Sequence, residues 1–174
     1  MSIIVCGLAD VPDLIARRRP SHLVTLLDPA SMIDTPEGLA ADRHLKLAVN
    51  DIADPMEGLI LPDESVVTRL LAFSRDWDET HPMLVHCWAG ISRSTASAFV
   101  LACERSPEAP EAQIALTMRR AAAHASPNRR IVALADDILG RRGRMVDAVA
   151  AMGDYDYEAA RPFEFQVRHP SRPA

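Results

Sequence analysis

The sequence predicts an α/β fold, with a central, mostly parallel sheet flanked by helices. Four short apolar runs bounded by Pro, Asp or Gly have the composition of buried strands, and they occupy residues 2–8, 22–28, 44–49 and 83–87. Helical patterns dominate the second half of the chain. Strands that alternate with helical segments are typical of α/β sheets.

Helices are predicted between and after these runs. Apolar side chains spaced along one helical face follow the third run: Val66, Leu70, Phe73 and Trp77. Pro62 and Asp63 mark the start of that helix, with Asp63 as its N-cap. Four further helices are predicted over residues 93–104, 111–123, 129–141 and 144–152.

The 174 residues, 48% of them hydrophobic, are enough to fill one core. We therefore expect a single domain over residues 1–153, followed by a C-terminal tail or arm over residues 154–174, where helical periodicity is lost. Within this segment, residues 162–167 are either a short edge strand or part of the arm.

Charge, cysteine content and hydropathy exclude several functional classes. A net charge of −5 provides no overall positive field, so we expect no nucleic-acid partner. Three cysteines without paired spacing argue against a secreted disulfide scaffold and for a reducing compartment. No apolar stretch is long enough to cross a bilayer and the first residues lack the pattern of a signal peptide. We expect a soluble, cytoplasmic protein with no membrane partner.

The segment from His86 to Ser94, with the sequence HCWAGISRS, carries the strongest chemical signal. It joins an apolar strand to a helical pattern, and the free N–H groups of a helix N-terminus bind anions. Five residues separate Cys87 from Arg93, which lets successive amides curl around one tetrahedral phosphate. The expected phosphate-binding residues are Trp88, Ala89, Gly90, Ile91, Ser92 and Arg93. The amides, the helix dipole and the guanidinium favour the thiolate of Cys87, which would then be a nucleophile at neutral pH.

This segment resembles the HCxxGxxR[S/T] signature of the cysteine-dependent protein-tyrosine phosphatase superfamily, and most closely the HCxAGxSRS form of the dual-specificity phosphatases. The resemblance continues in LAVND at residues 47–51 and in HASPN at residues 124–128, and it covers roughly residues 43 to 140. The segment before Leu47 and the C-terminal segment show no such resemblance. A fold of the protein-tyrosine and dual-specificity phosphatase type is implied.

The resemblance also implies a two-step reaction without a metal or other cofactor. Cys87 would attack phosphorus to form a cysteinyl-phosphate, which water then hydrolyses. Arg93 would donate two hydrogen bonds to phosphoryl oxygens, a task that the planar guanidinium suits. Ser94 would donate a hydrogen bond to the sulfur and help it leave. His86 either supports the loop through its ring nitrogens or only packs beneath it.

A general acid must protonate the leaving group, and Asp51 and Asp54 are the candidates. Asp51 is favoured because it matches the family pattern directly after an apolar strand. Asn128 either hydrogen-bonds the active-site loop or only begins the next helix, and Trp88 either packs under the loop or lines the pocket mouth. Cys6 is either a small buried hydrophobic residue or a partner for oxidised Cys87.

The predicted activity is hydrolysis of phosphate monoesters, with phosphotyrosine in proteins as the favoured substrate because the interior of the loop carries no lysine. The alternatives are an inositol phosphate or another small phosphoester, and an inactive phosphoester-binding module. Extra phosphates would need cations from outside the loop, and the candidates are Arg119, Arg120, Arg129 and Arg130.

Overall fold

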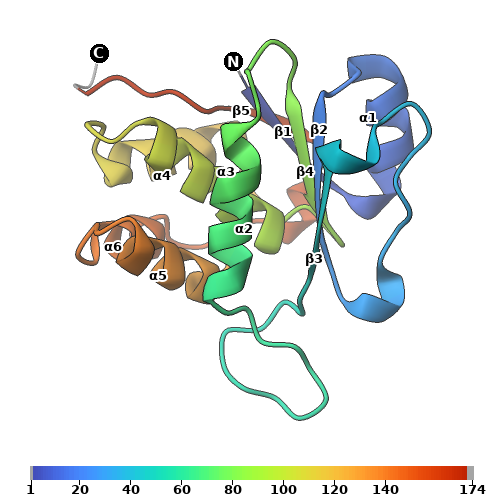
Figure 1. The fold of residues 1–174 in the computed structure, drawn as a ribbon. Coiled ribbons are helices and arrows are strands. Elements are labelled where there is room, and N and C mark those ends of the chain that lie inside the picture. The colour runs from blue at the N-terminus through green and yellow to red at the C-terminus, as the bar shows by residue number, and fades with distance from the viewer. Residues whose placement is uncertain (1, 172–174) are drawn as a thin grey trace.

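A five-stranded sheet organises the chain, which the computed structural model describes from residue 2 to residue 171 (Figure 1). The strands are β1 Ser2–Gly7, β2 His22–Leu27, β3 His44–Ala48, β4 Met83–Cys87 and β5 Phe163–Gln166, and their order in the sheet is β3-β2-β4-β1-β5. The first four strands run parallel, and β5 pairs antiparallel with β1. The predicted mostly parallel sheet is therefore confirmed, as are its first four strands.

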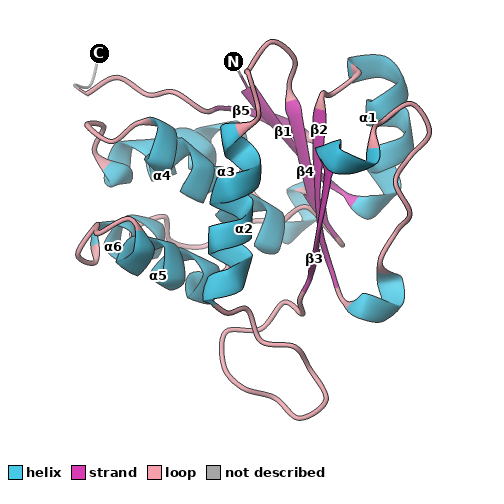
Figure 2. Cartoon of the chain, in the orientation of Figure 1, coloured by secondary structure: helices cyan, strands magenta, loops and turns pink. Residues whose placement is uncertain are grey.

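Helices cover both faces of the sheet, unequally (Figure 2). They are α1 Val11–Arg18, α2 Glu64–Arg75, α3 Arg93–Arg105, α4 Glu111–Ala121, α5 Arg129–Ile138 and α6 Arg144–Ala150. Figure 1 shows α1 on one side of the sheet and the other five helices on the opposite side. Successive side chains of β1 point to opposite faces of the sheet. Ile3 packs into the larger core, and Ile4 packs into the smaller one beneath α1.

Five of the six helices correspond to predicted segments. The start of α2 is also as predicted, because Asp63 caps it by accepting a hydrogen bond from the backbone N–H of Ser65 at 3.0 Å. Helix α1 was not expected from the sequence. It has only eight residues, and a single one of them, Val11, is buried, which leaves too short an apolar pattern to recognise.

The C-terminal segment joins the sheet through β5, so residues 162–167 contribute an edge strand. Phe163 and Phe165 are buried while Glu164 and Gln166 are exposed, the alternation of a strand with one covered face. Beyond the strand, the Ser106 hydroxyl donates to the Val167 carbonyl and accepts from the His169 N–H. Of the predicted C-terminal segment, residues 172–174 lie outside the described residues.

No helix between residues 2 and 171 combines the length and the apolar character that crossing a membrane requires.

The burial of β5 predicts that it stabilises the domain as a whole. Phe165 is 1% exposed, so Phe165→Ala should lower the free energy of unfolding by about 3–5 kcal/mol, the usual result of removing a buried phenyl group. Denaturant unfolding measures this change, and the exposed neighbour Gln166→Ala is the control, expected within about 0.5 kcal/mol of wild type. Equal stability of the two variants would mean that β5 does not contribute to the core.

Candidate active site

The loop from Cys87 to Arg93, which we call the Cys87 loop, runs from the carboxyl end of β4 to the first turn of α3. Its central residue, Gly90, has a φ of +74°, which side chains disfavour. A Cβ atom there would lie 2.6 Å from the carbonyl carbon of Cys6 and 2.8 Å from the nitrogen of Gly7. Only glycine therefore lets the loop curl against the end of β1.

The thiol of Cys87 lies at the base of this loop and is only 2% exposed. Its Sγ atom is 3.2 Å from the hydroxyl oxygen of Ser94, which belongs to the first turn of α3. The hydroxyl can donate to a thiolate in this geometry. The structure thus places Ser94 beside the sulfur, where the resemblance expects it.

The backbone N–H groups of the Cys87 loop are free to bind an anion. Within residues 2–171, no group of the protein accepts a hydrogen bond from the N–H of residues 89 to 92. Ser92 precedes α3 but does not cap it with its side chain, so the helix N-terminus is also open. Free amides at a helix N-terminus favour a bound phosphate.

Arg93 is 4% exposed and is fixed by a hydrogen bond from Nη1 to the carbonyl oxygen of Val49, 2.8 Å away. Its Nε atom is buried and has no hydrogen-bond partner in the described part of the chain. An unsatisfied buried N–H is costly unless a ligand accepts from it. The guanidinium therefore has a donor left for a phosphoryl oxygen.

Asp51 approaches the loop from the segment after β3. One of its carboxylate oxygens, Oδ1, accepts from the Ser92 hydroxyl at 2.7 Å and from the Asn128 side-chain amide at 2.8 Å. The other, Oδ2, lies 3.9 Å from Nε of Arg93. Asp54 is exposed, and its side chain makes no hydrogen bond within the described range. The structure brings Asp51, and not Asp54, to the Cys87 loop.

Asn128 fulfils both of the roles that the sequence left open. Its side-chain oxygen accepts from the N–H groups of Arg130 and Ile131, each at 3.1 Å, and so caps α5. Its side-chain amide binds Asp51, and its backbone N–H donates to the carbonyl of Ser92 at 3.2 Å. One residue thereby ties α5, the acidic side chain and the Cys87 loop together.

His86 supports the loop from below through a buried polar chain. Its Nδ1 lies 3.4 Å from the Cys87 carbonyl oxygen, and its Nε2 lies 2.7 Å from Oγ1 of Thr25. The same hydroxyl is 2.8 Å from Nε2 of His44, whose Nδ1 contacts Thr35 at 3.0 Å. If Nδ1 of His86 carries the proton, its Nε2 has none and accepts a hydrogen bond from the Thr25 hydroxyl. Because a hydroxyl donates only one hydrogen bond, Thr25 then accepts one from Nε2 of His44. Thr25 and His44 were not predicted, because they are far from the signature in the sequence.

The side chains of Trp88 and Cys6 lie in different environments, one exposed and one buried. The Trp88 side chain is 54% exposed and its Nε1 donates to a carboxylate oxygen of Asp28 at 3.2 Å, so it turns toward β2. Cys6 is a free, buried cysteine, and burial raises the pKa of its thiol far above the ordinary value. This environment fits the prediction that Cys6 is a small buried hydrophobic residue.

Comparison with known proteins gives matches in structure only. No protein-family model and no curated protein matches the sequence. The structure of DUSP15 aligns with a TM-score of 0.59 at 16% identity, over 85% of this chain and 88% of that chain. Human DUSP28 aligns with a TM-score of 0.56 at 17% identity, over 86% and 94% of the two chains. PTPMT1 aligns with a TM-score of 0.58 at 15% identity, again over 86% and 94%.

The chain has the fold of the dual-specificity phosphatases. The predicted fold of the protein-tyrosine and dual-specificity phosphatase type is confirmed.

A cavity of about 400 Å³ opens beside the Cys87 loop of this dual-specificity phosphatase fold. Its lining includes Asp51, the loop residues Ala89, Ile91 and Ser92, and Asn128. Arg129 and Tyr155 also line it. The sequence did not identify Tyr155, because it lies in a segment without periodicity and beyond the reach of the resemblance.

Of the four arginines considered for extra phosphates, only Arg129 lines this cavity. Arg119 donates to the backbone carbonyls of Ala123 and Met152, and Arg130 donates to the carbonyl of Pro62. These two guanidinium groups are thus engaged in holding the backbone.

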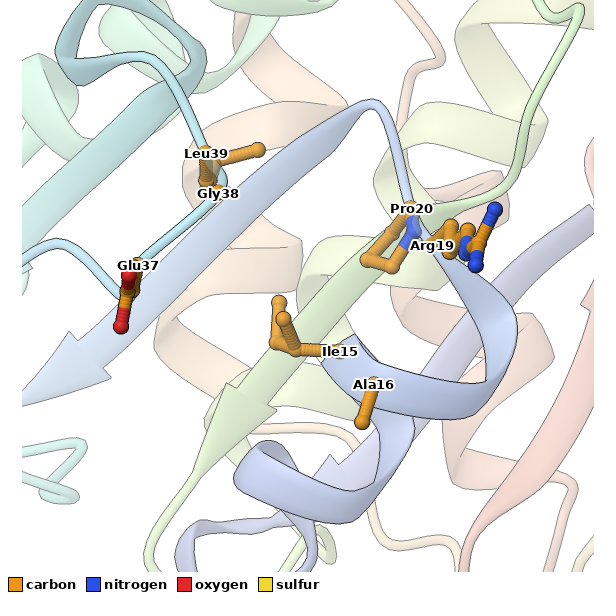
Figure 3. Close-up of a pocket in the computed structure, with 7 residues that line it drawn as sticks. All are labelled: Ile15, Ala16, Arg19, Pro20, Glu37, Gly38 and Leu39. Carbon is orange, nitrogen blue, oxygen red and sulfur yellow. The ribbon is translucent and has the colours of Figure 1, made fainter.

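Two other cavities lie between α1 and the loop that precedes β3. Figure 3 shows one of them, lined by Ile15 and Ala16 of α1 and by Glu37, Gly38 and Leu39 of the loop. The neighbouring one, of about 470 Å³, is lined mainly by apolar side chains. Neither contains a residue of the Cys87 loop, so they are separate from the site described above.

The buried histidines predict a pH-dependent stability. Burial lowers the pKa of His44 and of His86 from 6.5 to about 4. Between these values the unfolded chain takes up protons that the native protein does not, so stability should fall as the pH drops from about 6.5 to about 4. Thermal unfolding measured at several pH values tests this.

Because carboxylates also titrate in this range, the informative comparison is with His44→Gln, which removes one titrating ring. The melting temperature of that variant should change less between pH 6.5 and pH 4 than that of wild type. An unaltered pH dependence would contradict the assignment of His44 as a buried neutral ring.

Proposed function

We propose that the protein is a phosphatase that hydrolyses phosphate monoesters, preferably phosphotyrosine in proteins, through a cysteinyl-phosphate on Cys87. One observation carries the proposal: the buried thiol of Cys87 begins a loop whose amides at residues 89 to 92 are free and which ends at Arg93, whose buried Nε makes no hydrogen bond in the described chain. This arrangement supports a dianion placed within reach of a nucleophile. The fold is that of known phosphatases.

In the first step, the Cys87 thiolate attacks phosphorus and the bond to the alcohol oxygen breaks. Charge on the equatorial phosphoryl oxygens is stabilised by the amides of residues 89 to 92 and by the guanidinium of Arg93. The hydrogen bond from Arg93 to the Val49 carbonyl fixes the guanidinium, so little reorganisation accompanies the reaction.

Asp51 acts as general acid in this step and protonates the leaving oxygen. Its hydrogen bonds from Ser92 and Asn128 hold the carboxyl group at the edge of the loop, where a leaving group would emerge. In the second step the same carboxylate accepts a proton from the attacking water. Ser94 then donates its hydrogen bond to the departing sulfur.

The substrate preference rests on charge. The side chains between Cys87 and Arg93 are uncharged, so a single phosphate is satisfied by the loop and a second phosphate is not. An inositol phosphate is the second candidate, because Arg129 lines the adjacent cavity and adds one cation there. We also place the protein in the cytoplasm, where its free cysteines would stay reduced.

The nucleophile and the guanidinium give the first test of the activity. Cys87→Ser should abolish turnover of a phosphotyrosyl peptide, because the chemistry passes through the sulfur, yet it should still bind inorganic phosphate through the loop amides. Arg93→Lys keeps the charge but loses the planar fork, and kcat/KM should fall about 10²- to 10³-fold. Steady-state kinetics and calorimetric phosphate binding measure the two effects. Wild-type turnover in Cys87→Ser would refute the mechanism.

The general acid gives an independent test. Asp51→Asn should lower kcat on a phosphotyrosyl peptide by about 10²- to 10⁴-fold, the usual contribution of a general acid. The loss should be smaller on an aryl phosphate whose phenol leaves readily, since such a group needs less protonation. Asp54→Asn is the matched control and should retain wild-type rates. If Asp54→Asn shows the leaving-group dependence instead, the assignment of the acid is wrong.

A further inference from the structure

Tyr155 lies beside the proposed active site although it follows the last helix of the chain. It lines the same cavity as Ile91 and Ser92 of the Cys87 loop, and its side chain is 48% exposed. It is the one aromatic residue among those that line this cavity within residues 2–171. A half-exposed ring at a polar cavity offers a flat apolar surface to an incoming ligand.

The backbone on both sides of Tyr155 is anchored to the end of α4. The N–H of Asp156 donates to the carbonyl of Ala123 at 3.1 Å, and Nη1 of Arg119 donates to the same carbonyl at 2.5 Å. Nε of Arg119 also donates to the carbonyl of Met152 at 3.4 Å. The ring is therefore carried by a segment that is held in place without substrate.

Trp88, the aromatic residue within the loop, does not take this position. Its indole donates to Asp28, and Trp88 is not among the residues that line the cavity in the described chain. Ile91 of the loop does line it. Aliphatic side chains also line the cavity, among them Ile52 and Pro127, but Tyr155 provides its one aromatic ring within the described residues.

We propose that Tyr155 is a specificity-determining residue, whose ring packs against the aromatic ring of a phosphotyrosyl side chain bound in the Cys87 loop. This inference rests on the proposed function and names the residue that selects aryl over alkyl phosphates. Offset or edge-to-face ring contacts add affinity beyond the area they bury, and a phosphoseryl side chain has no ring to make them. The preference thus arises outside the phosphate-binding loop.

The test compares two peptides that differ only in carrying phosphotyrosine or phosphoserine. Tyr155→Ala should lower kcat/KM for the phosphotyrosyl peptide about tenfold, mainly through KM, because the ring contact is lost. The loss for the phosphoseryl peptide should be under about threefold, so the ratio of the two falls. Tyr155→Phe keeps the ring and should keep the ratio.

Tyr157→Ala is the matched control, because Tyr157 is 65% exposed and lies two positions away without lining the cavity. The Tyr157→Ala variant should keep the wild-type kcat/KM for both peptides. Equal losses on both peptides in Tyr155→Ala would show a structural role only, and no loss on either would show no role. Either result overturns the inference and leaves the proposed phosphatase activity intact.

A binding measurement separates this inference from the proposed function. In the Cys87→Ser background, Tyr155→Ala should weaken binding of the phosphotyrosyl peptide about tenfold and leave binding of inorganic phosphate unchanged. If wild type hydrolyses neither peptide, the proposed function fails and this measurement still decides the role of Tyr155. Unchanged affinity for the phosphotyrosyl peptide would refute that role.

Discussion

The close packing of Gly90 against the end of β1 is the contact on which the site depends. The parallel register places Gly7 opposite Cys87, and the N–H of Leu8 donates to the carbonyl of Trp88 at 3.0 Å. With a positive φ and no room for a Cβ atom, Gly90 turns the chain and keeps the loop packed against the end of β1. A loop pushed away from β1 would displace the free amides of residues 89 to 92 relative to Cys87.

The start of α5 is the second support, and it joins parts of the chain that are distant in sequence. The Ser126 N–H donates to the carbonyl of Ile91 at 2.9 Å, next to the bond from Asn128 to Ser92. The side-chain amide of Asn128 also donates to Asp51, whose other carboxylate oxygen lies 3.9 Å from Nε of Arg93. The start of α5 therefore holds both the Cys87 loop and the carboxyl group beside it.

The sequence predicted the parts of this structure that are set by local patterns. Apolar runs identified the first four strands, and the spacing of Val66 and Leu70 identified α2, since both are buried as one helical face requires. The helix α1 was missed because one buried residue makes no stripe. The antiparallel strand β5 remained undecided, because four alternating residues fit an arm as well as an edge strand.

The Cys87 loop could be recognised from sequence because its residues are contiguous and their spacing has a direct geometric meaning. Thr25, His44 and Tyr155 could not, since what brings them to the loop is sheet register and the anchoring of a C-terminal segment. The sequence favoured Asp51 over Asp54, and tertiary contacts with Ser92 and Asn128 are what bring Asp51 to the loop. Local patterns thus point to the proposed nucleophile, and the fold shows which groups surround it.

Detection of the covalent intermediate tests the central claim most directly. Ser94→Ala removes the hydroxyl that lies 3.2 Å from the sulfur, so breakdown of a cysteinyl-phosphate should slow and the intermediate should accumulate. Acid quenching during turnover of a phosphotyrosyl peptide, followed by mass spectrometry of the digest, should find one phosphoryl group on the fragment that contains Cys87. Phosphate release without any phosphoryl group on that fragment would contradict the account.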